Sequence, residues 1–352
     1  MFLTSKKNQL VGLDIGSRTV KAGEIVESKK GRLLRRFAMA EIPPGVIQDG
    51  VIKDASAAAR VIQELFQANG FKEQNVAISV GGYSVIVKKI SMPTMTEEQL
   101  QETIQFEAEQ YIPFDINDVN LDFQILGQND ANASQMHVLL VAAKKEMLDD
   151  YINLVQLVGL NPCVIDVDAF ALQNIYKINY PDDNESVALI DIGASKTSLN
   201  ILKDGNSVFM RDVSLGCGQI DQRIISLTGC TTQEAERIKL VEQTVAISIS
   251  DRAEIITGVV TDWCTEIRRA LDFFYSTYPD DQIKRIVLSG GGARIAEFRQ
   301  LLSSETGAMV ETIDPFRALE ADKGGFDEAF LEKAAPQAAI CMGLAIRKVD
   351  DK

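Results

Sequence analysis

"VGLDIGSRTVKAGEI" (residues 11–25) and "VALIDIGASKTSLNI" (residues 187–201) are two copies of one pattern. Each is an apolar run that ends in Asp-Ile-Gly and continues with small, hydroxylated and basic residues. A strand that ends in Asp and turns at Gly places a carboxylate beside backbone N–H groups. The N–H groups can hold phosphate oxygens, and the carboxylate can hold a Mg²⁺-bound water. One such turn is also typical of a simple strand end, but two copies predict a duplicated fold whose loops face each other across a cleft.

Length and composition indicate a globular protein of two domains or one large split domain, with 352 residues of which 46% are apolar and 24% charged. The net charge of −14 would repel a phosphate backbone, which excludes nucleic-acid binding. The start, "MFLTSKKNQL", lacks the apolar segment of a signal peptide, and no run approaches the roughly 18 apolar residues of a membrane span. We therefore expect a cytoplasmic protein with no direct membrane insertion.

Cysteine and histidine usage indicates neither disulfides nor a metal site. The five cysteines are scattered singly, which fits reduced thiols. The one histidine, His137, lies in the apolar run "MHVLLVAA" and is expected to be structural, because zinc and Ser-His-Asp chemistry need partners that are absent.

The first half predicts a strand hairpin at the first Asp-x-Gly turn, followed by an inserted subdomain. "EIPPGVIQDGVIKD" marks a boundary near 42–50, since its prolines and glycines break regular structure. Beyond it, two strands around a Gly-Gly turn and a helix that begins at a Thr96/Gln99 capping box indicate a small α+β unit. The expected elements are strands near 9–15, 19–27 and 32–41, a helix at 54–70, strands at 75–82 and 83–90, a helix at 96–112, strands near 120–127 and 136–143, a helix at 144–160, and then a strand and a helix from 162.

The second half repeats the strand, turn and strand at 187–202, after the hydrophilic junction 179–186. Helices follow across 231–278. "VLSGGGARI" then ends an apolar run in a Gly-Gly-Gly turn, which lets a backbone approach a base or phosphate closely. In "TTQEAERIKL", Glu236 and Lys239 stand one helical turn apart, where they form either a ribose site or a plain i,i+3 ion pair.

The order of these motifs resembles the actin-like ATPase superfamily. Within it, the chain resembles the PilM family of type IV pilus assembly proteins over nearly its whole length. "EAEQYIPF" (107–114) is the most specific stretch. The resemblance is carried by "GLDIGSRTVKAGEI" (12–25), "IPPGVIQDGVIKD" (42–54), "EAEQYIPFDINDVNLDFQILG" (107–127), "VLLVAAKKEMLDDYI" (138–152), "VIDVDAFAL" (164–172), "LIDIGASKTSLNIL" (189–202) and "SGGGARI" (289–295).

The resemblance implies an α/β, bilobed actin-like fold of two RNase H-like halves, with a small α+β subdomain inserted in the first half. It implies lobe I at 1–40 and 138–180, the insert at 41–137, and lobe II at 181–352 with a helical subdomain at about 218–282. It also implies ATP and Mg²⁺ between the lobes. The implied nucleotide contacts are Asp14, Gly16, Ser17 and Lys21 in the first phosphate loop, Asp191, Gly193, Ser195 and Thr197 in the second, Glu236 and Lys239 at the ribose, and Gly291, Gly292 and Arg294 at the adenosine, with Mg²⁺ held through water by Asp14 and Asp191.

The second loop departs from the superfamily pattern. Many members have Asp-x-Gly-Gly-Gly-Thr, whereas this chain has "DIGASKT", with Ala194 and Ser195 in place of glycines and Lys196 before the threonine. Fewer unhindered N–H groups therefore face the phosphates. Asp166 and Asp168 lie at the expected connection of the first lobe, where a carboxylate serves as a base or caps the following helix. We expect ATP to be held, with slow or no hydrolysis.

The resemblance implies a cytoplasmic scaffold, peripheral at the inner membrane through its partners. PilM-like proteins bind the N-terminal cytoplasmic segment of the inner-membrane protein PilN, in a groove between the first lobe and the insert. Other inner-membrane pilus proteins, the pilus motor ATPases and a homo-oligomer are further implied partners. Two alternatives stay open. One is an FtsA-like filament former of cell division, although the end "CMGLAIRKVDDK" offers no basic amphipathic membrane helix. The other is a small-molecule kinase, although no positioned base is evident.

Overall fold

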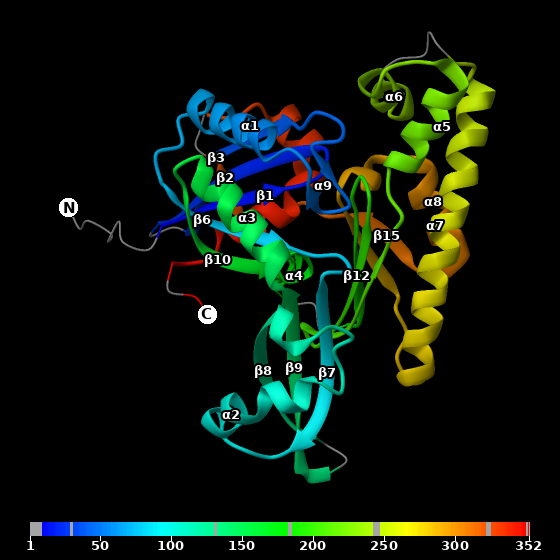
Figure 1. The fold of residues 1–352 in the computed structure, drawn as a ribbon. Helices are drawn as coiled ribbons and strands as arrows, with labels where there is room; N and C mark the ends of the chain where they lie inside the picture. Colours follow the sequence, from blue (N-terminus) through cyan, green and yellow to red (C-terminus); the bar gives the residue numbers. More distant parts are fainter. Residues whose placement is uncertain are drawn as a thin grey trace.

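The computed structural model describes residues 9–28, 31–129, 132–181, 185–241, 247–321, 325–349 and 351. Within them lie two lobes, each built on one mixed sheet, and a third unit that projects away from both (Figure 1). Parts of the predicted junction 179–186 and of the predicted helical segment 231–278 fall outside the described residues, namely 182–184 and 242–246.

Lobe I is a six-stranded sheet in the order β10-β6-β1-β2-β3-β16. One face carries a core formed with α1 and α3, and the other carries a core formed with α4 and α9. The bounds are β1 (Val11–Ile15), β2 (Thr19–Ser28), β3 (Gly31–Glu41), β6 (Asn75–Val80), β10 (Asn161–Val167) and β16 (Leu319–Ala321), with α1 (Ala55–Ala68), α3 (Lys145–Leu157), α4 (Asp168–Asn179), α9 (Glu328–Ala345) and a small hairpin of β4 (Ile47–Gln48) and β5 (Val51–Ile52).

Lobe II is a five-stranded sheet in the order β13-β12-β11-β14-β15, flanked by a helical unit. Trp263, Phe274 and Phe298 fill the core between this sheet and its helices. The bounds are β11 (Val187–Ile192), β12 (Thr197–Lys203), β13 (Asn206–Val213), β14 (Arg285–Ser289), β15 (Met309–Thr312), α5 (Gly218–Thr228), α6 (Thr232–Lys239), α7 (Ile249–Thr277), α8 (Ala296–Thr306) and a 3-10 turn η3 (Gly291–Arg294).

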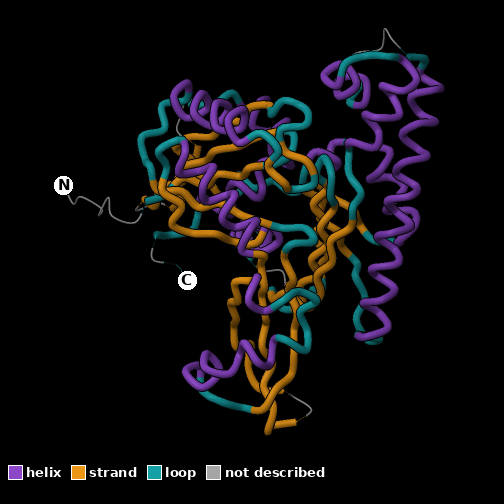
Figure 2. The backbone as a smooth tube through the Cα atoms, viewed as in Figure 1, coloured by secondary structure: helices purple, strands orange, loops and turns teal. Residues whose placement is uncertain are grey.

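The predicted duplication is confirmed by the sheets. In each lobe a first strand pairs antiparallel with a second, which pairs antiparallel with a third: β1, β2 and β3 in lobe I, and β11, β12 and β13 in lobe II. Each first strand also has a parallel neighbour, β6 or β14. Since α4 and α9 share one core with strands of both sheets, they form a packed layer between the lobes (Figure 2).

The projecting unit is a three-stranded antiparallel sheet in the order β7-β9-β8, which shares its core with α2. The capping box predicted at Thr96 and Gln99 is confirmed at the start of α2. The bounds are β7 (Val85–Pro93), α2 (Glu97–Ala108), the 3-10 turn η2 (Ile116–Asp118), β8 (Val119–Asn129) and β9 (Asn132–Lys144).

Sheet membership differs from the predicted division at three places. Residues 138–144 were predicted in lobe I, but they belong to β9 and pair with β7 and β8 in the sheet of the projecting unit. Strand β6 lies inside the lobe I sheet between β1 and β10, because "NVAISV" is buried and pairs in parallel on both sides. Residues 42–80 therefore go with lobe I and not with an insert at 41–137. Gly81 and Gly82 therefore connect two sheets and do not turn a hairpin. Strand β16 and helix α9 also pack on lobe I, although the chain from 181 onward was predicted as lobe II.

Candidate functional site

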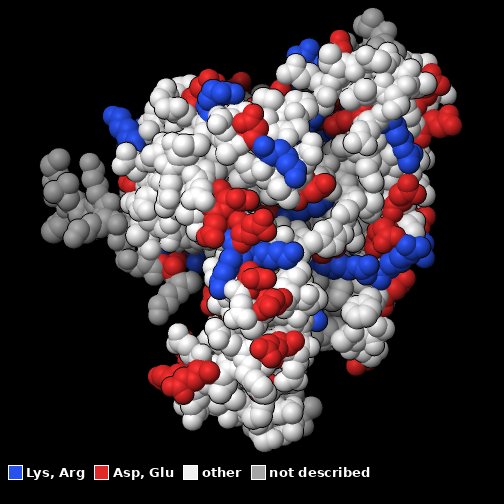
Figure 3. Space-filling view, viewed as in Figure 1, with Lys and Arg blue, Asp and Glu red and all other residues white. Residues whose placement is uncertain are grey.

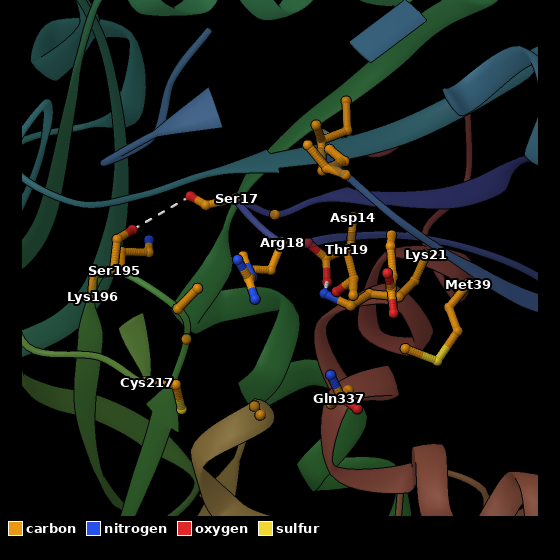
Figure 4. Close-up of a pocket in the computed structure, with 18 of the residues that line it drawn as sticks. Asp14, Ser17, Arg18, Thr19, Lys21, Met39, Ser195, Lys196, Cys217 and Gln337 are labelled. Atoms are coloured by element: carbon orange, nitrogen blue, oxygen red, sulfur yellow. Dashed lines mark hydrogen bonds and ion pairs between the residues drawn. The ribbon is translucent and has the colours of Figure 1, made fainter. Parts of the chain in front are cut away.

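The two Asp-Ile-Gly turns have the same backbone geometry and meet between the lobes. The Gly16 N–H donates to the Thr19 carbonyl at 3.1 Å, and the Gly193 N–H donates to the Lys196 carbonyl at 2.9 Å. Figure 4 shows Ser17 and Ser195 pointing toward one another from opposite loops, with their hydroxyl oxygens 3.4 Å apart. Both turns line a cavity of about 750 Å³, within the size range of small-molecule sites.

All but two of the predicted site residues line this cavity. Those that do are Asp14, Gly16, Ser17, Lys21, Asp191, Gly193, Ser195, Glu236, Lys239, Gly291 and Arg294. The structure therefore brings the four predicted motifs to one place, although they are dispersed from residue 14 to residue 294.

Thr197 and Gly292 lie behind the cavity wall and have packing roles. The Thr197 hydroxyl is buried and donates to the Leu215 carbonyl at 2.8 Å. A Cβ on Gly292 would stand 2.4 Å from the Ile192 side chain, so the glycine permits close packing of η3 on β11. Neither residue lines the cavity, in contrast to the sequence-based expectation.

The first turn holds a buried ion pair. Lys21 Nζ lies 3.0 Å from Asp14 Oδ2, and both side chains are about 11% exposed. Burial raises the pKa of Asp14 against the opposing charge of Lys21. Burial lowers the pKa of Lys21, but the Asp14 charge and hydrogen bond outweigh it, so that the lysine stays protonated. The turn thus presents a fixed cation to the cavity.

The second turn contributes another cation, which reaches lobe I. Lys196 Nζ lies 2.5 Å from Asp168 Oδ2 at the start of α4. Burial opposes the charge of Lys196, but Asp168 and Asp212 outweigh burial and hold its pKa above the ordinary lysine value. In turn, the Lys196 charge overcomes the effect of burial on Asp168 and lowers its pKa. This pair crosses between the lobes.

Asp191 is the carboxylate that best fits a bound cation. Burial, with the negative charges of Asp168 and Asp14 nearby, raises its pKa to about 6. A divalent cation beside it would offset this cost of burying charge. Among the residues that the structure describes, no group of three His, Cys, Asp or Glu side chains is placed to hold a metal ion directly.

Glu236 and Lys239 form the i,i+3 ion pair that was one of the two sequence-based interpretations. Lys239 Nζ lies 2.5 Å from Glu236 Oε2. Lys239 also lies 2.8 Å from Asp221, and its side chain is only 2% exposed. Arg18 of lobe I reaches Asp221 at 3.6 Å, so the network links the first turn to the helical unit of lobe II. Glu236 remains 38% exposed and faces the cavity, which leaves its carboxylate open to a hydroxyl.

The glycine turn closes the cavity from the side of α9. Gly290 adopts φ +83°, and a Cβ there would stand 2.4 Å from the Ile192 carbonyl oxygen. The Gly290 N–H donates to the Pro336 carbonyl at 2.8 Å, which fixes the turn to α9. Gly291 faces open space, since the nearest atom to its Cβ position is Gln337 Nε2 at 3.8 Å. A flat group can approach this backbone closely.

The structure adds residues that the sequence reasoning did not assign to the site. Arg18 and Lys196 lie inside the two turn motifs. Their signal in the sequence is a basic residue two or three positions after Asp-Ile-Gly. Asp221 and Gln337 gave no local signal, because each reaches the cavity only through the packing of its helix. The carboxylates considered as bases are both occupied, Asp168 by Lys196 and Asp166 by Arg347 at 3.1 Å.

Comparison with known protein families shows to which family the chain belongs. The family model of type IV pilus assembly protein PilM matches residues 12–349. The chain belongs to the PilM family. This membership favours neither the cell-division alternative nor the kinase alternative. Among the described residues, no helix combines the length and the apolar character required to cross a bilayer.

Solved structures agree with this assignment. The chain is similar to a chain of the "PilM-PilN type IV pilus biogenesis complex", with 26% identity, a TM-score of 0.85, and coverage of 96% of this chain and 98% of that one. It shares its fold with the ethanolamine utilization protein EutJ from Carboxydothermus hydrogenoformans, at 13% identity, a TM-score of 0.59 and coverage of 97% and 90%. MreB 5 of Spiroplasma citri bound to AMPPNP matches at 14% identity, a TM-score of 0.50 and coverage of 96% and 95%. The bilobed actin-like fold predicted from the sequence is thus confirmed.

Proposed function

We propose that this chain is a cytoplasmic, ATP-binding scaffold of type IV pilus assembly. It would bind the N-terminal segment of a PilN-type inner-membrane protein, lie at the membrane through that partner, and link it to the pilus motor ATPases. Membership in the PilM family and the similarity to a chain of a PilM-PilN complex support the partner. The observation that carries nucleotide binding is the meeting of two Asp-Ile-Gly turns across one cavity.

The charges of the cavity suit a triphosphate. Lys21 and Lys196 supply cations at the two turns, and Ser17 and Ala194, which follow the turn glycines, line the same cavity. Glu236 and Lys239 would hold the ribose, and Gly291 with Arg294 would border the adenosine. The fold relative MreB 5 was solved with AMPPNP bound, which is consistent with this use of the fold.

Hydrolysis is expected to be slow or absent, because Ala194 and Ser195 replace glycines in the second loop, so that fewer unhindered N–H groups face the phosphates. Asp168 is paired with Lys196 and Asp166 with Arg347. While its ion pair with Lys196 is intact, Asp168 accepts a proton from water poorly, because the pair favours the charged form of this carboxylate and lowers its pKa. Nucleotide would therefore act as a clamp between the lobes, favouring the lobe arrangement that binds it more tightly.

Asp191 and Asp14 would hold Mg²⁺ through water, and the cation would neutralise phosphate charge. Affinity for AMPPNP is expected to fall about tenfold when EDTA replaces Mg²⁺, since one charge-assisted contact is worth about 1.5–3 kcal/mol. Calorimetry measures this change. Asp191→Asn should bind AMPPNP equally with and without Mg²⁺, whereas Asp212→Asn, outside the metal site, should keep the tenfold difference. A variant Asp191→Asn with full Mg²⁺ dependence would contradict this role.

Besides the groove between the first lobe and the insert that the resemblance implies, the projecting unit offers a surface for the partner segment. Figure 3 shows acidic side chains gathered at the end of this unit, where α2 exposes Glu97, Glu98, Glu102 and Glu109. Phe106 on the same helix is 70% exposed. A peptide with basic and apolar residues would complement both features.

A synthetic PilN N-terminal peptide is expected to bind the full chain with one-to-one stoichiometry in calorimetry. Phe106→Ser should weaken binding about tenfold, because exposed aromatic residues carry much of the energy of such interfaces. Phe273→Ser on α7, where the side chain is 58% exposed, is the matched control and should leave the affinity unchanged. Absence of binding both with and without ATP would refute the scaffold proposal.

A further inference from the structure

Lys196 lies where the second turn, lobe I and the projecting unit come together. Its Nζ reaches Asp168 at the start of α4, and both residues line the cavity. Figure 4 shows Lys196 next to Ser195 on the second turn. The Lys196 side chain is 28% exposed, so that it faces both its partner and the cavity. No other lysine in the two turns spans the lobes in this way, within the part of the chain that the structure describes.

The connection from lobe I to the projecting unit rests directly on this ion pair. A Cβ on Gly81 would stand 2.3 Å from Lys196 Nζ and 2.5 Å from Asp168 Oδ2, so a larger residue here would displace the ion pair. The Gly82 N–H donates to Asp212 Oδ2 of β13 at 2.7 Å. The Tyr83 hydroxyl accepts from the Ser214 N–H at 3.1 Å. Residues 81–84 are therefore held between the ion pair and the end of β13.

The same segment also touches the return connection. The Lys144 N–H, at the end of β9, donates to the Ser84 carbonyl at 3.0 Å. Both links between the projecting unit and lobe I thus meet at residues 81–84 and 144. A change in the Lys196–Asp168 contact acts at the base of the whole unit.

An anion that enters the cavity beside Ser195 competes with Asp168 for Lys196. A phosphate oxygen can accept a charge-assisted hydrogen bond as well as a carboxylate does. The second turn has side chains at Ala194 and Ser195, so Lys196 is the strongest donor that this turn offers. Its ammonium is a flexible point charge, which suits exchange between two acceptors.

We propose that Lys196 is the specificity-determining residue for a terminal phosphate, and that it exchanges Asp168 for this phosphate and thereby releases residues 81–84. Asp168 is then a positioning residue, which holds the ammonium in place when no terminal phosphate is present. The inference rests on the proposed binding of nucleotide between the lobes. With this exchange, a bound triphosphate alters the base of the projecting unit, whereas a bound diphosphate does not.

Nucleotide selectivity in calorimetry tests this role, with Mg²⁺ present and AMPPNP as the triphosphate. The wild-type chain should bind AMPPNP about tenfold more tightly than ADP, the size of one charge-assisted contact. Lys196→Gln should bind the two equally, and Lys196→Arg should restore most of the preference. Lys203→Gln, on the same β-hairpin and paired with Asp281, is the control and should keep the preference. If the Lys196–Asp168 ion pair had only a structural role, Lys196→Gln would change the affinities for AMPPNP and ADP by the same factor.

Amide hydrogen exchange gives the second measurement. AMPPNP, but not ADP, should accelerate exchange at Gly82 in the wild-type chain by about tenfold, and should leave it unchanged in Lys196→Gln. An unaltered preference in Lys196→Gln, an equal loss for both nucleotides, or a wild type without preference would each overturn the inference while nucleotide binding stands. A wild type that binds neither nucleotide would instead refute the nucleotide part of the proposed function.

Discussion

Gly343→Ala is expected to lower the free energy of unfolding by roughly 1–3 kcal/mol, the usual cost of overpacking a core. Gly343 lies in α9, and a Cβ there would stand 1.8 Å from the Ala171 carbonyl oxygen of α4. The clash is with backbone, so no side-chain rotation relieves it, and the two helices must separate. Because α9 also packs against Gly12 of β1, where a Cβ would meet the Cys341 carbonyl at 2.3 Å, the strain spreads into the layer between the lobes.

Urea unfolding followed by circular dichroism measures this loss, with Gly258→Ala in α7 as the control. A Cβ at Gly258 would approach only the end of the flexible Arg223 side chain, at 3.0 Å. Alanine is about 1 kcal/mol better than glycine in a helix, so Gly258→Ala should gain stability or lose none. Equal midpoints for the two variants would show that α4 and α9 do not pack as closely as described.

The local features of the fold could be predicted from the sequence. The β1–β2 and β11–β12 hairpins follow from apolar runs on both sides of an Asp-Ile-Gly turn, and α2 follows from its capping box. Sheet membership could not be predicted in the same way. "NVAISV" has the same composition whether it forms a hairpin with the next strand or a parallel pair with β1, and the choice depends on contacts with residues far along the chain.

In the candidate site, too, the residues placed by local turns could be predicted, and those placed by contacts between distant segments could not. Glycines and acidic residues within the repeated motifs reach the cavity because the local turn places them there. Thr197 belongs to the same motif but turns inward toward Leu215, since side chains alternate along β12. The ion pairs Lys196–Asp168 and Lys239–Asp221 join residues from separate elements, so no local sequence pattern predicts them.

Lys21→Met is expected to cost both stability and nucleotide affinity, for separable reasons. It leaves the buried Asp14 carboxylate without its cation, and breaking such a pair typically costs about 3–5 kcal/mol. It also removes a cation that faces the phosphates, which should weaken AMPPNP binding roughly 10- to 100-fold. The double variant Lys21→Met/Asp14→Asn removes both charges, so that it should regain most of the lost stability but none of the affinity.

Glu24→Gln provides the matched control on the same strand. The Glu24 carboxylate is buried and paired with Arg36 at 2.6 Å and with Arg35 at 3.1 Å, but it does not line the cavity. This variant should therefore lose stability in urea unfolding and bind AMPPNP as the wild type does in calorimetry. If the double variant at the first turn recovered affinity together with stability, Lys21 would serve only to neutralise Asp14. Loss of affinity despite recovered stability would assign the charges of the Lys21–Asp14 pair to the bound nucleotide and its Mg²⁺, because the fold no longer depends on them.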